Sequence, residues 1–182
     1  MGNAPEADSG EIPPVADEQA ALRRVATLVA GGAPPEQVFA AVTAEAGGVL
    51  SADFTSLCRY DADGPVEVEV VGTWSETGRA HPIPVGSWLP AEGANVHTKV
   101  FRTRRPARVD RFAADAGPRL AAVLTAGVRS GVGAPVWAEG RMWGVVTASS
   151  TGEPLPAGIE TRLAGFTELV ATAVATPRRT LR

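Results

Sequence analysis

The first fifty residues carry apolar positions at helical spacing. One such stretch covers residues 17–30 and a second covers residues 34–50. Asp17 is the expected N-cap of the first helix, and Gly31-Gly32 is expected to end it. Pro34-Pro35 suits the first turn of the second helix. The chain therefore opens with two consecutive helices.

Beyond residue 50 the apolar spacing becomes two, which is typical of strands. Residues 53–60 and 66–74 alternate on either side of the turn sequence at 61–64, so they predict a β-hairpin. A long Pro/Gly-rich loop follows at 75–92, with a short strand near 83–88; loops of this length inside a domain are more often functional than idle. The remaining pattern predicts a helix at 94–103, a strand at 106–112, a helix at 118–127, a hairpin at 127–150 and a last helix at 156–175. Together these elements predict an α+β fold with one antiparallel sheet and helices on its faces.

The glycine-rich stretch around "GVGAPV" at 131–136 permits three interpretations. A dinucleotide-binding loop would need a third glycine and a following helix, whereas this stretch carries Pro135 and leads into another strand-like run. A serine elbow is also disfavoured, because no helix follows Ser130. The hairpin interpretation fits, with Glu139-Gly140 as the tight turn and small residues that permit close packing.

Composition narrows the function classes. The 182 residues have a net charge of −3, which gives no support to a nucleic-acid partner. One cysteine and two histidines cannot build a disulfide framework or a convincing metal site. No run is apolar enough for membrane insertion and the start is not a signal peptide, so a cytoplasmic location is expected. Residues 1–16 are expected to be a disordered acidic leader and 177–182 a tail, around a domain at 17–176.

Four segments together resemble a GAF domain of the bacterial sensor type. They read "ADFTSLCRYDADG", "HTKVFRTRRPARVDRF", "AGVRSGVGAPVWAEGRMWGVVTASS" and "LAGFTELVATAVA", in that order, and span roughly residues 20–175. The resemblance implies a profilin-like three-layer α/β/α fold whose antiparallel sheet has five or six strands. It places the terminal helices on one face and a loop-covered pocket on the other. It also implies a cytoplasmic small-molecule or redox sensor, usually dimeric, that serves a histidine kinase or a similar output.

The chain departs from the motifs of several cofactor-binding GAF domains. These departures disfavour particular cofactors, and the cofactor itself stays unknown. Haem-binding members have a histidine just before the "VRS" strand, where this chain has none. Bilin-binding members need a cysteine beside a histidine, and Cys58 is far in sequence from both His81 and His97. The spaced signature of cyclic-nucleotide binders is missing, and sulfoxide reductases on this fold use several cysteines. Haem, bilin and cyclic nucleotide are therefore disfavoured. Arg104 replaces a glycine common at the end of the family's short helix, which predicts strain or a different ending.

Each candidate ligand-pocket residue has a plainer alternative. Two tryptophans could line a pocket for a planar ligand or belong to the core, and His97 could bind a ligand or sit on a solvated helix face. The family pocket is bounded by the short helix and the strand after it, which contribute two phenylalanines and a basic cluster. That cluster could hold an anion or be a solvated rim. The candidates are Trp74, Trp88, His97, Phe101, Arg108 and Phe112, and the cluster comprises Lys99, Arg102, Arg104, Arg105, Arg108 and Arg111.

Two further features concern redox chemistry and assembly. Cys58 could be a redox-sensing thiol, although a lone cysteine in a sheet is more often a small buried hydrophobe. Trp137 and Trp143 flank the hairpin turn and suit sheet packing or an interface. The last helix carries a heptad-like seam expected to combine internal packing with a homodimer contact. The seam residues are Ile159, Leu163, Phe166, Val170 and Ala173.

The sequence thus predicts a non-enzymatic GAF sensory module that binds a small molecule, relays a signal through a dimer, or does both. Ligand contacts would stabilise one arrangement of loop 75–92, and the terminal helices would transmit it. Two alternatives stay open: a structural dimerisation domain without a ligand, and a redox sensor or enzyme that uses Cys58.

Overall fold

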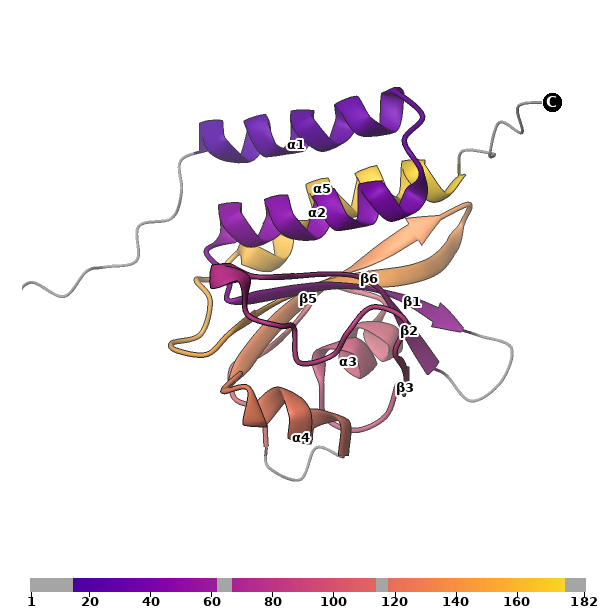
Figure 1. Cartoon of the computed structure of the whole chain (residues 1–182). Coiled ribbons are helices and arrows are strands. Elements are labelled where there is room, and N and C mark those ends of the chain that lie inside the picture. The colour runs from indigo at the N-terminus through magenta and orange to yellow at the C-terminus, as the bar shows by residue number, and fades with distance from the viewer. Residues whose placement is uncertain (1–14, 62–66, 114–117, 176–182) are drawn as a thin grey trace, which may run out of the picture.

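The computed structural model describes residues 15–61, 67–113 and 118–175 (Figure 1). Residues 1–14 of the expected leader at 1–16, residues 62–64 of the expected turn and the tail at 177–182 therefore lie outside the described residues, whereas residues 15 and 16 already belong to the first helix. The first helix begins at Val15, so Asp17 lies in its first turn and is not its N-cap. In that position its negative charge still interacts favourably with the positive, N-terminal end of the helix dipole.

The described strands form one six-stranded antiparallel sheet, which confirms the predicted fold class. The strand order is β3-β2-β1-β6-β5-β4, so both hairpins lie side by side with β1 and β6 at the centre. The two short strands, each of three residues, occupy the edges. The bounds are β1 Phe54–Asp61, β2 Glu67–Ser75, β3 Trp88–Pro90, β4 Ala107–Val109, β5 Ser130–Ala138 and β6 Arg141–Ser150.

Helices cover the two faces of this sheet unequally (Figure 1). On one face lie α2 (Pro35–Leu50) and α5 (Ile159–Ala175), and α1 (Val15–Ala30) packs on these two helices, away from the sheet. The other face carries α3 (Val96–Thr103), α4 (Pro118–Thr125) and the loop that includes the short helix η1 (Glu76–Gly78). The helix-covered face holds the larger hydrophobic core, and a smaller apolar cluster lies on the α3 side.

The glycine-rich stretch is a hairpin, as predicted. Glu139 and Gly140 have φ angles of +51° and +75°, which a two-residue hairpin turn of this kind requires. A Cβ on Gly133 would come within 2.6 Å of Val96, and one on Gly131 within 3.2 Å of Phe112. The two glycines therefore let α3 and the segment after β4 pack closely against β5. The "GVG" sequence serves packing, and no helix follows it to receive a phosphate.

A β-bulge in β2 places Trp74, a candidate pocket residue, on the helix-covered face of the sheet. Leu57 pairs with Gly72 and Cys58 with Val70, so Val71 is an extra residue in the ladder. Because an extra residue reverses the alternation of faces, side chains beyond the bulge point to the opposite side. Trp74 therefore lies against α2 and does not share a face with Val70. Its ring occupies the place that a Cβ on Gly47 of α2 would take.

The seam on the last helix packs inside the chain. All five of its residues belong to the larger core, and none is more than 8% exposed. The helix places them against β5 and α2. These side chains are buried in the chain's own core and do not reach its surface. The expectation that they also contact a partner subunit is therefore wrong. The heptad-like spacing was the inner stripe of a helix lying on a sheet.

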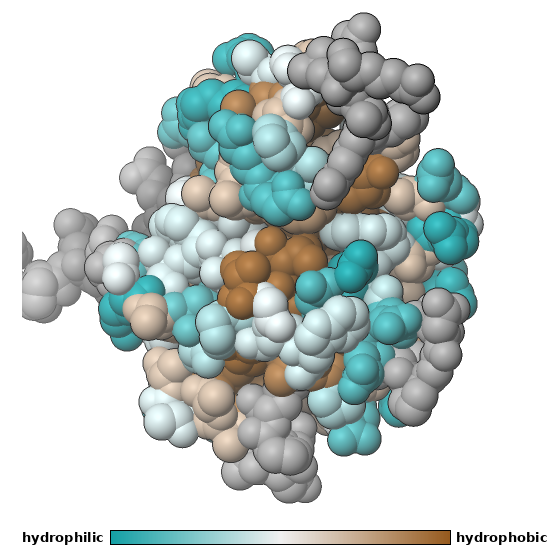
Figure 2. All heavy atoms as spheres, turned by 45° about the vertical axis from the view of Figure 1, so that its right-hand side comes forward, coloured by the Kyte–Doolittle hydropathy of each residue, from teal (hydrophilic) through white to brown (hydrophobic). Residues whose placement is uncertain are grey.

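On the face drawn in Figure 2, hydrophilic and intermediate residues surround an apolar area near the middle, and smaller apolar areas lie above and below it. The large hydrophobic residues exposed in the described part of the chain are Val15, Val85, Trp88 and Trp137. Trp143 by contrast is partly buried and packs on Phe39, with ring centroids 5.6 Å apart. None of the described helices is long and apolar enough to cross a membrane.

Candidate ligand-binding site

A cavity of about 60 Å³ lies on the α3 side of the sheet. Three kinds of structure enclose it: the sheet face of β1 and β6, the helices α3 and α4, and the loop after η1. Its wall is mostly apolar but includes two imidazoles, one amide and several hydroxyls. Apolar lining residues are Phe54, Pro82, Ile83, Val96, Phe112, Leu120, Val123 and Val128, and polar ones are Thr55, Ser56, His81, Asn95, His97, Thr147 and Ser149.

The loop closes the cavity through contacts to one aromatic ring. The His81 ring meets Phe54 edge-on at 5.6 Å, and the Arg79 guanidinium lies 5.2 Å from the centre of the same ring. The far end of the loop is fastened to the sheet, because the N–H of Gly86 donates to the Val70 carbonyl at 2.8 Å. The loop therefore has a fixed stem and a portion held over the cavity by Phe54.

His81 is a hydrogen-bonding group in this wall. Its Nδ1 lies 2.7 Å from the Ile83 carbonyl oxygen and 3.2 Å from the Ile83 backbone nitrogen, so Ile83 offers this ring nitrogen a partner in either tautomer. Burial lowers the pKa of His81 below its usual value of 6.5, although the hydrogen bond to Ile83 opposes this shift. Because burial disfavours the charged form of this imidazole, the wall suits recognition of a small, uncharged polar ligand.

His97 joins the cavity to the buried cysteine. Its Nε2 lies 3.6 Å from Cys58 Sγ, although 39 residues separate the two in sequence. The Tyr60 hydroxyl donates to the His97 backbone carbonyl at 2.7 Å and so helps to position α3 over the sheet. Distance along the sequence was therefore a wrong guide to this pair. Cys58 is itself 1% exposed and belongs to the smaller apolar cluster.

The structure brings only two of the six predicted pocket residues, His97 and Phe112, to the cavity wall. Trp74 faces α2 beyond the bulge, as described above. Trp88 lies on the edge strand β3, is 45% exposed, and stacks near the Arg59 guanidinium at 6.0 Å. Phe101 packs on Tyr60, with ring centroids 5.0 Å apart, beside the cavity and not in its wall. Neither Trp88 nor Phe101 belongs to the cavity wall, contrary to the prediction. The reason is that the position of a residue in a helix or strand does not fix how far its ring lies from a cavity.

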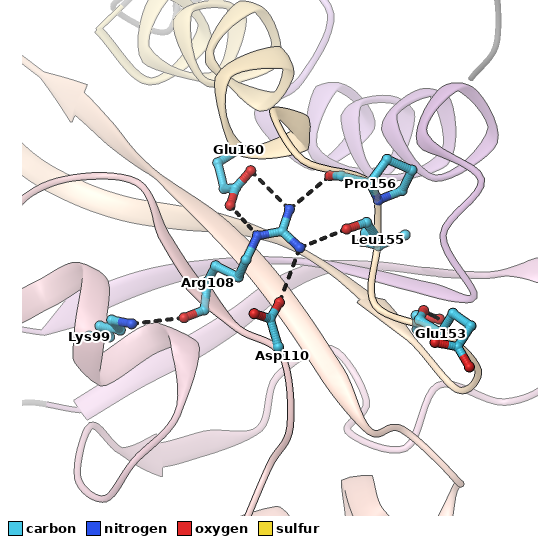
Figure 3. A network of polar contacts seen from close by, with 8 residues as sticks. Lys99, Arg108, Asp110, Glu153, Leu155, Pro156 and Glu160 are labelled. Carbon is cyan, nitrogen blue, oxygen red and sulfur yellow. Dashed lines mark hydrogen bonds and ion pairs between the residues drawn. The ribbon is translucent and has the colours of Figure 1, made fainter. Parts of the chain in front are cut away.

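Arg108, the sixth candidate, points away from the cavity and binds the start of the last helix (Figure 3). Its guanidinium donates to both carboxylate oxygens of Glu160 and to the carbonyls of Leu155 and Pro156, the last two at 2.6 and 2.8 Å. A further hydrogen bond reaches Asp110 at 3.2 Å. Hydrogen bonding to Arg108 lowers the pKa of the Glu160 carboxyl. The pairing with Glu160 correspondingly raises the pKa of the Arg108 guanidinium.

The backbone of Arg108 is also held by α3. Lys99 Nζ, on α3, donates to the Arg108 backbone carbonyl at 2.8 Å (Figure 3). Lys99 thus connects the helix that borders the cavity to β4, and Arg108 connects β4 to α5. At its end α3 closes with Arg104 at φ +55°, a conformation that favours glycine, so the strain expected there is present.

Sequence reasoning missed His81, Ile83 and the α4 residues Leu120 and Val123. The loop that supplies His81 has no periodicity, so nothing in its pattern indicates which side chain turns inward. Within the described ranges no group of three His, Cys, Asp or Glu side chains could hold a metal ion.

A comparison with family models finds a match to the GAF domain over residues 34–176. No curated protein sequence matches the chain detectably.

Solved structures with the same architecture are numerous but distant in sequence. The phycoerythrobilin-bound GAF domain from a cyanobacterial phytochrome has a TM-score of 0.66 at 20% identity, over 87% of this chain and 94% of that one. The GAF domain from Acinetobacter phosphoenolpyruvate-protein phosphotransferase has a TM-score of 0.66 at 14% identity, over 87% and 92%. The chromophore-binding domain of a Stigmatella aurantiaca bacteriophytochrome has a TM-score of 0.65 at 14% identity, over 94% of this chain but 64% of that one. At such identities the likeness shows a shared fold.

Proposed function

Since this chain belongs to the GAF domain family, whose members are typically sensory or regulatory modules of signalling proteins, we propose that it is a non-enzymatic sensor that binds a small molecule in the cavity under the loop. The main support for this proposal is the composition of the cavity wall. It combines a mostly apolar lining with two imidazoles, and burial lowers the pKa of one of them, His81. Ligand sites of this kind are mostly apolar, with a few polar groups that fix orientation.

The size of the cavity restricts the ligand. Pockets for drug-sized ligands are roughly 300–1,000 Å³, whereas this cavity measures about 60 Å³. We infer a ligand of about one ring, or a larger one that enters only when the loop opens. A bilin, as bound by two of the similar GAF domains, does not fit these residues. With the loop closed the cavity is too small, and Cys58 is buried in β1 and does not belong to the cavity wall.

Signal transfer would use the contacts on either side of Arg108. A ligand that repositions α3 also moves Lys99, and Lys99 bonds the strand whose Arg108 holds the first turn of α5. Ligand binding would thereby favour one position of α5 relative to the sheet, a population shift between two arrangements. Arg108 thus provides a direct connection from the cavity helix to the terminal helix.

The proposed setting is a cytoplasmic, homodimeric signalling protein with an output such as a histidine kinase. The GAF assignment supports a signalling role in general. A dimer would have to use surfaces other than the inner seam of α5, because that seam is filled by the chain's own core.

The first test compares native and denaturing mass spectra of freshly purified protein. Extra non-covalent mass in the native spectrum supports a binding module and identifies its ligand, and the same spectrum gives the oligomeric state. A bare protein is then titrated with phenol, a single ring with one hydrogen-bonding group, while the imidazole NMR signals of His81 and His97 are followed. Saturable shifts support the cavity as a binding site.

A matched pair of variants controls this titration. Val123→Phe places a ring into the cavity from α4, whereas Ala122→Phe adds the same ring at an exposed position on the same helix. Phenol shifts should disappear in the first variant and persist in the second. Shifts that survive Val123→Phe, or no saturable shift in the wild type, would instead favour a structural dimerisation domain with a filled pocket.

The contact between Cys58 and His97 favours one alternative function, a peroxide sensor. An imidazole at 3.6 Å could accept the thiol proton, and the resulting thiolate could attack hydrogen peroxide, forming a sulfenic acid and releasing water. Trapping the sulfenic acid with dimedone and weighing the intact protein tests this function. If dimedone does not label the wild type, or labels Cys58→Ser equally, the peroxide-sensor function is excluded.

A further inference from the structure

A second hollow lies on the side of α3 that faces away from the cavity. It is an open groove of about 340 Å³ between α3, the end of β4 and the segment before α3. We call it the α3 groove. Its wall consists of Gly93, Ala94, Asn95, Thr98, Lys99, Arg102, Thr103, Val109, Arg111 and Ala113.

Positive charge is concentrated in the α3 groove, although the chain as a whole has a net charge of −3. Lys99, Arg102 and Arg111 line it, and none of the lining residues is acidic. Lys99 donates one hydrogen bond to the Arg108 carbonyl and keeps two further N–H groups. No ion pair to a carboxylate within the described ranges engages these three cations.

Several arginines elsewhere in the described part of the chain form ion pairs with carboxylates. Arg24 pairs with Glu45 at 2.6 Å and Arg162 with Glu18 at 2.6 Å. Arg108, from the same basic cluster as the groove residues, is bound by Glu160. Three neighbouring cations without such partners repel one another and leave a local potential suited to an anion of more than one charge.

Polar groups in the groove wall add hydrogen-bonding capacity. Thr98 is 2% exposed, and its hydroxyl has no hydrogen-bond partner in the described part of the chain. Because Thr98 belongs to the groove wall, its hydroxyl can serve as a hydrogen-bonding group for a ligand. Asn95 caps α3 by accepting the Thr98 N–H at 2.9 Å and borders both the groove and the cavity.

We propose that the α3 groove binds a small phosphate-bearing molecule. Two guanidinium groups can each hold phosphate oxygens through paired hydrogen bonds, and the lysine adds a point charge. A single carboxylate can pair with only one arginine, whereas a polyanion with several charges can pair with all three cations. Because Asn95 and α3 border the cavity as well, occupancy of the groove changes the environment of His97.

Isothermal titration calorimetry with sodium tripolyphosphate tests the binding step at low salt. The expected result is one site per chain, weakened by added sodium chloride. The double variant Arg102→Gln/Arg111→Gln should lose at least about tenfold in affinity, as expected when hydrogen bonds to charged groups are removed. The matched control Arg104→Gln/Arg105→Gln removes the same charge from exposed positions outside the groove. Both variants are first checked for an unchanged melting temperature.

The outcomes separate a built site from general attraction of anions. A tenfold loss confined to the groove variant supports the proposal. Equal losses in the groove and control variants, or no saturable binding to the wild type, overturn it. Citrate binding as tightly as tripolyphosphate overturns the phosphate class. Coupling to the cavity is tested by the His97 imidazole NMR signal, which should shift on tripolyphosphate binding in the wild type; a signal that stays in place while the groove saturates overturns that part.

Discussion

The two faces of the sheet differ in how completely they are packed. On the α2/α5 face the side chains interlock, and core residues such as Val42 and Phe166 are fully buried. On the α3 face the apolar cluster is smaller, and a cavity and a basic groove lie on the two sides of one short helix. Dense packing is what gives stability, whereas a binding site must leave space and unpaired polar groups. The comparison indicates that one face holds the fold together, whereas the other carries the two proposed binding sites.

Replacing one phenylalanine on each face tests this difference in packing most directly. Phe166→Ala on the helix-covered face should lower the free energy of unfolding by about 3–5 kcal/mol, because it leaves a void in a filled core. Phe112→Ala on the cavity side should cost only about 1–2 kcal/mol, because that ring is half-buried beside existing space. Urea denaturation of both variants measures this. Equal losses would mean that the two faces contribute alike.

A glycine pair on α2 tests how tightly the helix-covered face is packed. A Cβ on Gly47 would lie 2.1 Å from the Trp74 ring, so Gly47→Ala should destabilise by about 1–3 kcal/mol. The neighbouring Gly48 has nothing within 4 Å of such a Cβ, and Gly48→Ala should stabilise by up to about 1 kcal/mol through helix propensity. Thermal denaturation of the two variants should therefore show shifts of opposite sign. A stabilised Gly47→Ala would show that Trp74 moves aside at little cost.

The Arg108–Glu160 contact, which links the two faces, should appear as acid sensitivity. Arg108 holds the pKa of Glu160 below its usual 4.5, so this carboxylate's contribution to stability is complete above that value and is lost as the pH falls through the lower, folded-state pKa. Between about pH 5 and 3, Glu160→Gln should therefore lose less stability than the wild type. The control Glu153→Gln, at an exposed position, should keep the wild-type slope. A wild-type slope in Glu160→Gln would show that the pair does not bind α5 to β4.

The smallest expected effect concerns His81 on the cavity side. Burial lowers its pKa below 6.5, so the folded state binds protons less readily than the unfolded chain. The His81 contribution to stability is therefore present above about pH 6.5 and declines as the pH falls. His81→Asn should flatten the stability profile between about pH 7.5 and 5.5. Because the cause is burial and not a charge partner, 0.5 M salt, roughly a 4 Å screening length, should leave the wild-type slope unchanged.

Local sequence was sufficient to determine the order and type of the elements. Pro34-Pro35, Gly31-Gly32 and the Glu139-Gly140 turn act through backbone angles that a few neighbouring residues impose, so the helices and the hairpin followed from short stretches. The family resemblance extended this to the sheet and its layers. The departure from glycine at Arg104 predicted strain or a different ending, and the left-handed conformation of Arg104 matches the first of these.

Tertiary structure alone decided the contents of the site. One extra residue, Val71, reversed the face of Trp74, and periodicity cannot reveal a bulge that depends on pairing with β1. The Cys58–His97 and Arg108–Glu160 contacts join residues 39 and 52 positions apart. His81 turns inward from a loop that has no pattern at all. Periodicity states which side of an element is apolar, but which residues meet across a cavity depends on how the layers are stacked, and that is settled only when the whole chain has packed.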